Sequence, residues 1–200
     1  MPDRLIVFDI GNVLLRFDTR IAARNFDRHD PGKGTALSSA LWSYPLMHRF
    51  ETGKIAGRDL FDRLRKRFDL KMTYPIFRKS FTGIFDPIRE NLSLFRKFTQ
   101  ERKVALLSNV NEIHWAYILR RYPVLRRAQV RCASCELGVM KPDPRAYRYV
   151  AERSGATLRK MVYVDDREEF IRAARRLGVT AIHFTGKRPL KKLFDDVGIN

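Results

Sequence analysis

Five short apolar runs most strongly constrain how this 200-residue chain can fold. They are "LIVFD" (5–9), "KVALLSN" (103–109), "QVRCA" (129–133), "MVYVDD" (161–166) and "TAIHF" (180–184). Each is rich in branched or aromatic side chains and is bounded by polar or turn-forming residues, which is typical of a buried strand. Amphipathic helical patterns at 87–100, 143–155 and 167–178 alternate with these runs. The alternation predicts an α/β fold, a Rossmann-like parallel sheet with helices on both faces.

Residues 19–84 interrupt this alternation. They contain several helical patterns and no convincing strand, and the clearest pattern (57–68) aligns Leu60, Leu64 and Phe68 on one face. We therefore predict a small all-helical cap at 19–84, inserted after the first strand and lying over the strand ends. Residues 1–18 and 85–200 would then form the α/β core domain.

Polar residues gather where the predicted strands end. Asp9 ends the first strand, Ser108 and Asn109 end the second, Asp165 and Asp166 end a later one, and Lys141 lies in the loop "LGVMKPDP". Open α/β sheets bind ligands outside the carboxyl ends of their strands, so these side chains are expected to meet at one edge. Carboxylates so close together repel one another unless a cation neutralises them, and hard oxygen ligands favour Mg²⁺.

Four of these segments, taken in order, resemble the motifs of the haloacid dehalogenase (HAD) superfamily, most of whose members are Mg²⁺-dependent phosphatases. They are "FDIGNVL", "LLSN", "GVMKPDPRAY" and "VYVDDREEFIRAARRLG". The first is similar to the D-x-G-N-V motif of a bacterial subgroup that includes glucose-1-phosphate phosphatases. The segment "RFETGKIAGRDLFDRL" (49–64) also resembles the cap of that subgroup.

The resemblance implies a role for each residue at the strand ends. Asp9 would be the nucleophile that forms an aspartyl-phosphate. Mg²⁺ would be held by Asp9, the main-chain carbonyl of Gly11 and Asp166, with Asp165 as a direct or outer-sphere partner. Ser108 would donate to a phosphoryl oxygen, helped by the amide of Asn109, and Lys141 would offset the charge of the phosphoryl group and of the nucleophile.

The resulting hypothesis is a cytoplasmic, Mg²⁺-dependent phosphatase that hydrolyses small phosphomonoesters, with sugar phosphates as the implied substrates. The partner would be a small phosphorylated metabolite. No secretory signal or apolar run of roughly 18 residues is present, which predicts no membrane association.

Gly11 departs from the family pattern, because most of these phosphatases have a second Asp two residues after the nucleophile. That Asp protonates the leaving alcohol and later activates water, and losing such a group typically costs ~10²–10⁴ in rate. Three interpretations follow: a cap residue or water replaces the acid, the protein is a metal-independent 2-haloacid dehalogenase, or it is a weak enzyme that mainly binds. We favour the first. Phe170, where the family often has Asn or Asp, is a second departure.

Individual residues also have simpler interpretations. Asp166 could be the N-cap of the helix at 167–177, and His114 could simply pack within "NEIHWAYIL". Arg49 and Lys54 flank the "ETG" turn of the cap, where a substrate contact or a solvated surface position is possible. Cys132 and Cys135 form a C-x-x-C pair without the other ligands of a zinc site, which indicates ordinary thiols.

The formal net charge of +18 raises a rival hypothesis, a nucleic-acid-binding protein on a HAD-like fold. The basic residues are spread through the whole sequence, however, and form no basic tail. This favours solvated helix faces, so nucleic acid is a possible but not a favoured partner. A basic face on one side of the folded protein would strengthen the rival hypothesis, and an even spread would weaken it.

Overall fold

The computed structural model describes residues 4–199 and contains the predicted parallel sheet. Its strands are β1 (Leu5–Phe8), β4 (Val104–Ser108), β5 (Val130–Ala133), β6 (Met161–Asp165) and β7 (Thr180–His183), in the order β5-β4-β1-β6-β7. All four pairings are parallel, and Phe8 of the central strand is in register with Leu106 and Val164. The register brings the carboxyl ends of β4, β1 and β6 to one edge.

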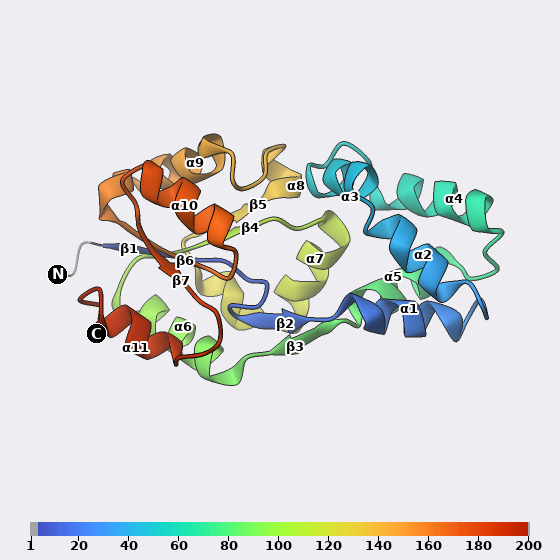
Figure 1. The fold of residues 1–200 in the computed structure, drawn as a ribbon, viewed down its shortest axis with the longest axis horizontal. Helices are drawn as coiled ribbons and strands as arrows, with labels where there is room; N and C mark the ends of the chain where they lie inside the picture. The colour runs from blue at the N-terminus through green and yellow to red at the C-terminus, as the bar shows by residue number, and fades with distance from the viewer. Residues whose placement is uncertain (1–3, 200) are drawn as a thin grey trace.

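Helices cover both faces of the sheet, so the predicted α/β class is confirmed (Figure 1). One face packs against α6 (Arg89–Glu101), α7 (Glu112–Arg121) and α11 (Leu190–Asp195), and the other against α9 (Pro144–Ser154) and α10 (Glu168–Arg176). Side chains of β1 alternate between the two cores: Ile6 and Phe8 enter the first, and Leu5 and Val7 the second. Since β1 is buried on both faces, its sequence is continuously apolar.

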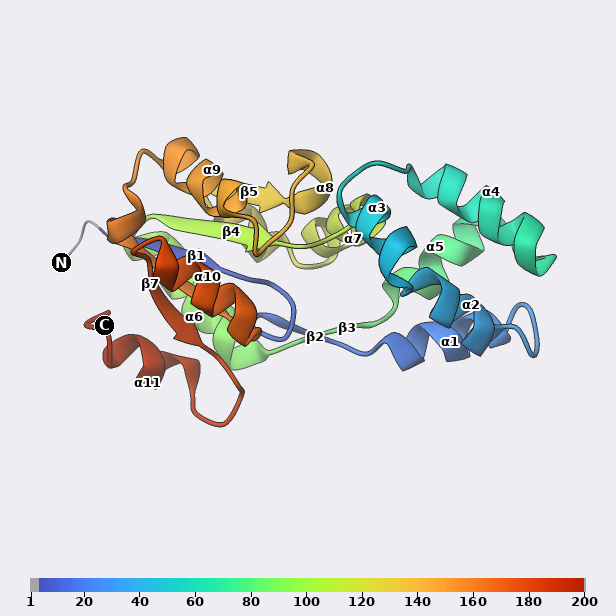
Figure 2. The same cartoon turned by 45° about the horizontal axis from the view of Figure 1, so that its top comes forward.

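Five helices lie together beyond the carboxyl edge of the sheet, at the opposite end of the molecule from the two termini (Figure 2). They are α1 (Thr19–Asp27), α2 (Gly34–Leu41), α3 (Tyr44–Glu51), α4 (Gly57–Phe68) and α5 (Tyr74–Thr82), and we call them the helical cap. They share an apolar core that includes Phe26, Phe61, Phe77 and Phe81, together with Ile113 of α7. The cap therefore packs against the α/β part of the chain through α7.

A two-stranded antiparallel ribbon connects the cap to the sheet. It pairs β2 (Leu15–Phe17) with β3 (Phe85–Pro87) and carries the chain into and out of the cap. The sequence analysis predicts neither strand, because three residues are too few to show a periodicity. Short elements complete the fold: the helix α8 (Ser134–Leu137) and the 3₁₀ turns Pro123–Arg127 and Leu158–Lys160. None of the helices in residues 4–199 has the length and apolar character needed to span a membrane.

Candidate active site

The carboxyl edge of the sheet, under the cap, encloses a cavity of about 330 Å³. It is lined by six of the candidate site residues predicted from the sequence: Asp9, Gly11, Ser108, Asn109, Lys141 and Asp166. Asp165 is fully buried directly behind this surface. The remaining walls are mostly apolar and come largely from the cap, the ribbon and α7: Phe17, Trp42, Met47, Ile84, Phe85 and Ile118. The cavity therefore combines a polar lining at the strand ends with a mostly apolar lining from the cap, the ribbon and α7.

Lys141 lies at the centre of the polar lining. Its side chain is 1% exposed, and its Nζ donates to Asp9 Oδ1 at 2.7 Å and to Asp165 Oδ2 at 2.6 Å. Burial alone would lower the pKa of Lys141, but the two carboxylates outweigh it and raise that pKa above its ordinary value. Lys141 is therefore a permanent positive charge that ties Asp9 to Asp165.

Phe170, which stands where the family often has Asn or Asp, is one of two aromatic rings that enclose Lys141. The Lys141 ammonium lies 5.1 Å from the ring centre of Phe170 and 5.6 Å from that of Tyr163. These rings exclude water while their π-faces favour the cation. Phe170 is thus part of the enclosure of the lysine.

Asp9, Asp165 and Asp166 place one carboxylate oxygen each within 4.8 Å of one another. Burial raises the pKa of Asp9 to about 7; Lys141 opposes this rise and the charge of Asp165 adds to it. The pKa of Asp166 is also raised by burial, against a hydrogen bond from Asn12 Nδ2 to Asp166 Oδ2 of 2.9 Å. The three carboxylates share one positive side chain, Lys141, which leaves excess negative charge at this place. Three carboxylate oxygens so close together suit a hard divalent ion.

The two members of the acidic doublet have different surroundings. Both oxygens of Asp165 are engaged: Oδ1 accepts from the backbone N of Arg167 at 2.8 Å, and Oδ2 accepts from Lys141 and from the Tyr163 hydroxyl. These contacts favour an outer-sphere role for Asp165. Asp166 lines the cavity, and it is not a helix N-cap, since Arg167 occupies the N-cap position of α10 and Asp166 bonds to Asn12 instead.

Ser108 and Asn109 are neighbours in sequence but make different contacts. Ser108 ends β4, is buried and lines the cavity. The side-chain amide of Asn109 is engaged with the backbone of Lys141: Asn109 Nδ2 donates to Lys141 O at 2.9 Å, and Lys141 N donates to Asn109 Oδ1 at 2.8 Å. Asn109 therefore holds the loop that carries the lysine.

The turn after Asp9 is shaped by Asn12 and by crowding at Gly11. Asn12 adopts the left-handed conformation, with φ 52°. Gly11 is not left-handed, but a Cβ there would lie 3.1 Å from Cε1 of Phe17 and 3.7 Å from Asp9 Oδ2. The glycine thus allows the Phe17 ring to lie where the second Asp of most family phosphatases would begin.

Glu51 lines the cavity and was missed by the sequence analysis, which singled out its neighbours Arg49 and Lys54. Lys54 lines an adjoining cavity that also contains Glu51, Lys141 and Arg167, whereas Arg49 is not among the residues that line either one. The only hint in the sequence was the "ETG" turn, of which Glu51 is the first residue. His114 is buried against Phe81, as expected from its apolar surroundings.

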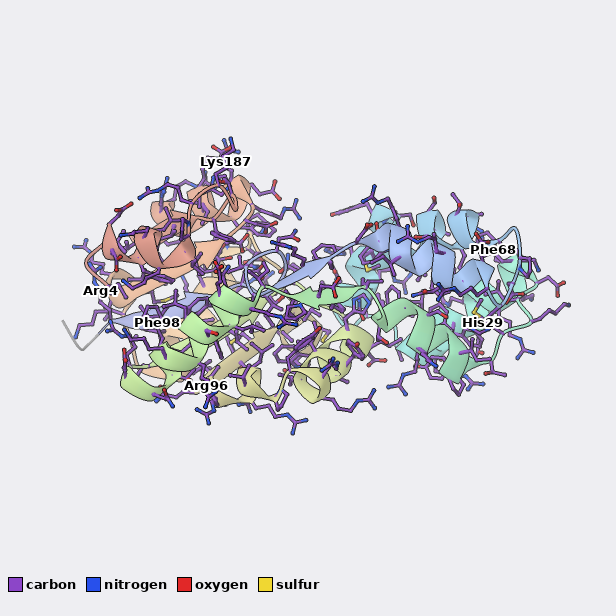
Figure 3. All side chains as sticks on the ribbon, turned by 90° about the horizontal axis from the view of Figure 1, so that it is seen from below. Arg4, His29, Phe68, Arg96, Phe98 and Lys187 are labelled. Atoms are coloured by element: carbon purple, nitrogen blue, oxygen red, sulfur yellow. The ribbon has the colours of Figure 1, made fainter. Side chains whose placement is uncertain are left out.

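The two cysteines and the charge distribution add no second site. Burial raises the pKa of both Cys132 and Cys135 to about 12, so neither is a thiolate near neutral pH. Basic side chains project from separate places around the α/β part of the molecule, as Arg4, Arg96 and Lys187 illustrate (Figure 3). This spread gives no support to the nucleic-acid hypothesis.

Comparison with known proteins decides the family. The model of the haloacid dehalogenase-like hydrolases matches residues 4–178. The chain belongs to that family. This HAD-like hydrolase is 25% identical over 186 residues to the sesquiterpene phosphatase astK of Aspergillus oryzae, covering 90% of this chain and 88% of the relative.

Solved structures share the fold of this HAD-like hydrolase. The magnesium complex of the HAD family enzyme bt-2542 from Bacteroides thetaiotaomicron superposes with a TM-score of 0.84 at 22% identity, over 97% of this chain and 99% of that one. A HAD-like family hydrolase from Porphyromonas gingivalis gives 0.84 at 19% identity, over 100% of both chains. The narrower resemblance to the D-x-G-N-V subgroup stays a prediction.

Proposed function

We propose that this protein is a Mg²⁺-dependent phosphatase that hydrolyses phosphomonoesters through an aspartyl-phosphate on Asp9. The observation that carries the proposal is the arrangement of three groups at one cavity wall: a buried carboxylate at a strand end, a buried lysine hydrogen-bonded to it, and Asp166 within ligand-sharing distance. Phosphoryl transfer requires positioning and charge stabilisation rather than elaborate covalent chemistry, and this arrangement supplies both.

The residues present fit a magnesium ion. Asp9, Asp166 and the main-chain carbonyl of Gly11 would hold it, and Asp165 would act from outside through Lys141. When bound, Mg²⁺ would neutralise part of the phosphate charge and polarise the phosphorus centre.

The protein's own groups would perform the transfer. Asp9 would attack phosphorus, and its approach is fixed by the Lys141 hydrogen bond and by its place at the end of β1. Lys141 would stabilise the charge that accumulates on the phosphoryl oxygens, and the Ser108 hydroxyl would donate to one of them. The cap residues Trp42 and Met47 would cover the phosphate and exclude water.

The apolar lining of the cavity bears on the alcohol portion of the substrate. A sugar phosphate, the class that the sequence resemblance implied, would bring several hydroxyl groups against walls that are mostly apolar, such as Phe17, Met47 and Ile84. Glu51 is one of few lining side chains there that could pair with them. An apolar alcohol would bury its surface there at roughly 25 cal/mol per Å². The relative named as a sesquiterpene phosphatase supports the same choice. We therefore propose monophosphates of apolar alcohols as substrates.

A single screen with purified protein and Mg²⁺ tests the proposal. Phosphate release should be faster from farnesyl phosphate than from glucose 1-phosphate, should stop with EDTA, and should be lost in Asp9→Asn but kept in Asp59→Asn, whose carboxylate is exposed on α4. A preference for glucose 1-phosphate would reverse the substrate assignment. Halide release from 2-chloropropionate in EDTA, without phosphate release, would instead establish the dehalogenase alternative.

A further inference from the structure

The proposed reaction has no proton donor at the position where this family usually provides one. An alkoxide is a poor leaving group unless it is protonated as the bond to phosphorus breaks. Gly11 has no side chain to protonate it, and the space beside Gly11 is occupied by the ring of Phe17. A second side chain at the cavity that could supply the proton is therefore of interest.

Most titratable side chains that line the cavity are already engaged. Lys141 is shared between two carboxylates, and Asp166 accepts from Asn12. His114 is buried, and burial lowers its pKa to about 4. Both of its ring nitrogens have partners, because Nε2 lies 3.1 Å from Phe81 O and Nδ1 lies 3.0 Å from Asn111 Nδ2. A neutral imidazole whose two nitrogens are both hydrogen-bonded to protein cannot deliver a proton to the substrate.

Glu51 differs from all of these. It is the last residue of α3 and lines both the main cavity and the adjoining one. In residues 4–199, no side chain or backbone group forms a hydrogen bond or an ion pair with the Glu51 carboxyl. Its position at a helix C-terminus also disfavours a negative charge, because the helix dipole places partial negative charge there.

We propose that Glu51 of the cap is the general acid–base catalyst of the hydrolysis, in place of the acid that is absent at position 11. This inference rests on the proposed phosphatase function. It assigns to the cap a chemical role beyond covering the site.

The electrostatic surroundings support this role. Burial raises the pKa of Glu51 to about 7, while the charges of Arg167 and Lys141 oppose the rise. A carboxyl that titrates near neutral pH can donate a proton in one half-reaction and accept one in the next.

Each half-reaction balances with Glu51 in this role. First, an Asp9 oxygen bonds to phosphorus, the ester P–O bond breaks, and the leaving oxygen takes the proton of the Glu51 carboxyl. Then water bonds to phosphorus as its proton passes to the Glu51 carboxylate, and the P–O bond to Asp9 breaks. Inorganic phosphate is released, and both carboxyl groups return to their starting states.

Two esters of similar size and different leaving groups test the assignment. 4-Nitrophenolate leaves without protonation, whereas the benzyl alcoholate does not. In Glu51→Gln, kcat/KM for benzyl phosphate should fall ~10²–10⁴-fold, and for 4-nitrophenyl phosphate by less than about tenfold. Because the variant also lacks the base for the second step, 4-nitrophenolate should appear in a burst equal to the enzyme concentration. Glu51→Asp should recover part of the benzyl phosphate activity.

The controls distinguish a failure of the Glu51 assignment from a failure of the phosphatase proposal. Asp62→Asn, an exposed carboxylate of the same cap that pairs with Arg58, should behave as wild type on both esters. If Glu51→Gln lowers both kcat/KM values equally and shows no burst, or leaves both unchanged, the Glu51 assignment is wrong while the phosphatase proposal stands. A wild-type protein that releases phosphate from neither ester with Mg²⁺ would overturn both.

Discussion

Asn109 and Lys141 are joined by two reciprocal hydrogen bonds between one side chain and one backbone, Asn109 Nδ2 to Lys141 O at 2.9 Å and Lys141 N to Asn109 Oδ1 at 2.8 Å. The side-chain amide of Asn109, which directly follows β4, thus fixes the backbone from which the Lys141 side chain extends. The two residues belong to different sequence motifs, so the fold connects them only in three dimensions.

Asn109→Ala should therefore lower kcat more than it lowers stability. Two lost hydrogen bonds are worth about 1–2 kcal/mol of unfolding free energy, whereas displacing Lys141 by about 1 Å can cost ~10² in rate. Urea denaturation and phosphate-release kinetics measure the two effects. Asn25→Ala, which removes a cap hydrogen bond to Ser80 O, is the control and should keep its kcat. A kcat for Asn109→Ala within twofold of wild type would contradict the positioning role.

Lys141→Met should destabilise the protein strongly in EDTA. It would leave Asp9 and Asp165 buried without their shared cation, and breaking a buried ion pair typically costs about 3–5 kcal/mol. Adding Asp165→Asn removes one of the stranded charges, so the double variant should be more stable than Lys141→Met alone. Denaturant unfolding at pH 7 gives the coupling energy, and purely additive effects would show that the three groups do not act together.

Much of this architecture could be predicted from the sequence because its signals are local. The apolar runs give the strands to within one or two residues, and the "GRDLFDRLRKRF" pattern gives α4 with its observed bounds. Ser108 and Asp165 end their strands and Asp9 directly follows β1, so parallel pairing alone brings them to one edge.

The remaining features depend on tertiary contacts. The β2–β3 ribbon pairs residues that are about 70 positions apart, through strands too short to have a pattern. Glu51 is notable only because the fold partly buries it in the cavity, where the charges of Lys141 and Arg167 act on it. The apolar lining of the cavity is likewise assembled from the ribbon, the cap and α7, so no single motif could show it.

Magnesium should stabilise the folded protein through Asp166. A ligand that binds only the native state adds about 2.7 kcal/mol at a concentration of 100 Kd, which corresponds to a rise in Tm of about 5–10 °C for a chain of this size. Thermal unfolding with MgCl₂ and with EDTA measures the rise. Asp166→Asn should remove most of it, and Asp59→Asn should retain it. An equal rise in both variants would place the metal elsewhere.

His114 should make stability depend on pH between about 4 and 6.5. Burial lowers its pKa from 6.5 to about 4 in the folded protein, so in this range the unfolded chain binds the extra proton. The stabilisation is complete above pH 6.5 and declines by about 3 kcal/mol as the pH falls to 4. Unfolding free energies of wild type and His114→Gln, measured across this range, should converge toward low pH. Parallel curves would show that His114 does not contribute.

Gly53 and Gly32 provide a matched test of whether activity depends on the close contact between the cap and α8. Both are left-handed, with φ 68° and 77°, so an alanine at either position should cost about 1–2 kcal/mol of unfolding free energy. They differ in surroundings. A Cβ at Gly53 would lie 2.3 Å from the carbonyl oxygen of Cys135 in α8, whereas a Cβ at Gly32 would have no atom within 4 Å.

Gly53→Ala should therefore displace the turn that follows Glu51 and separate the cap from the core, while Gly32→Ala leaves that contact intact. We expect kcat/KM for an apolar phosphomonoester to fall at least tenfold in Gly53→Ala and to stay within twofold of wild type in Gly32→Ala. Gly53→Ala should also lose more stability, because it adds a clash with a backbone carbonyl to the left-handed strain that the two variants share. If the two variants lose activity equally, or neither does, the contact between Gly53 and Cys135 does not control the position of the cap during turnover.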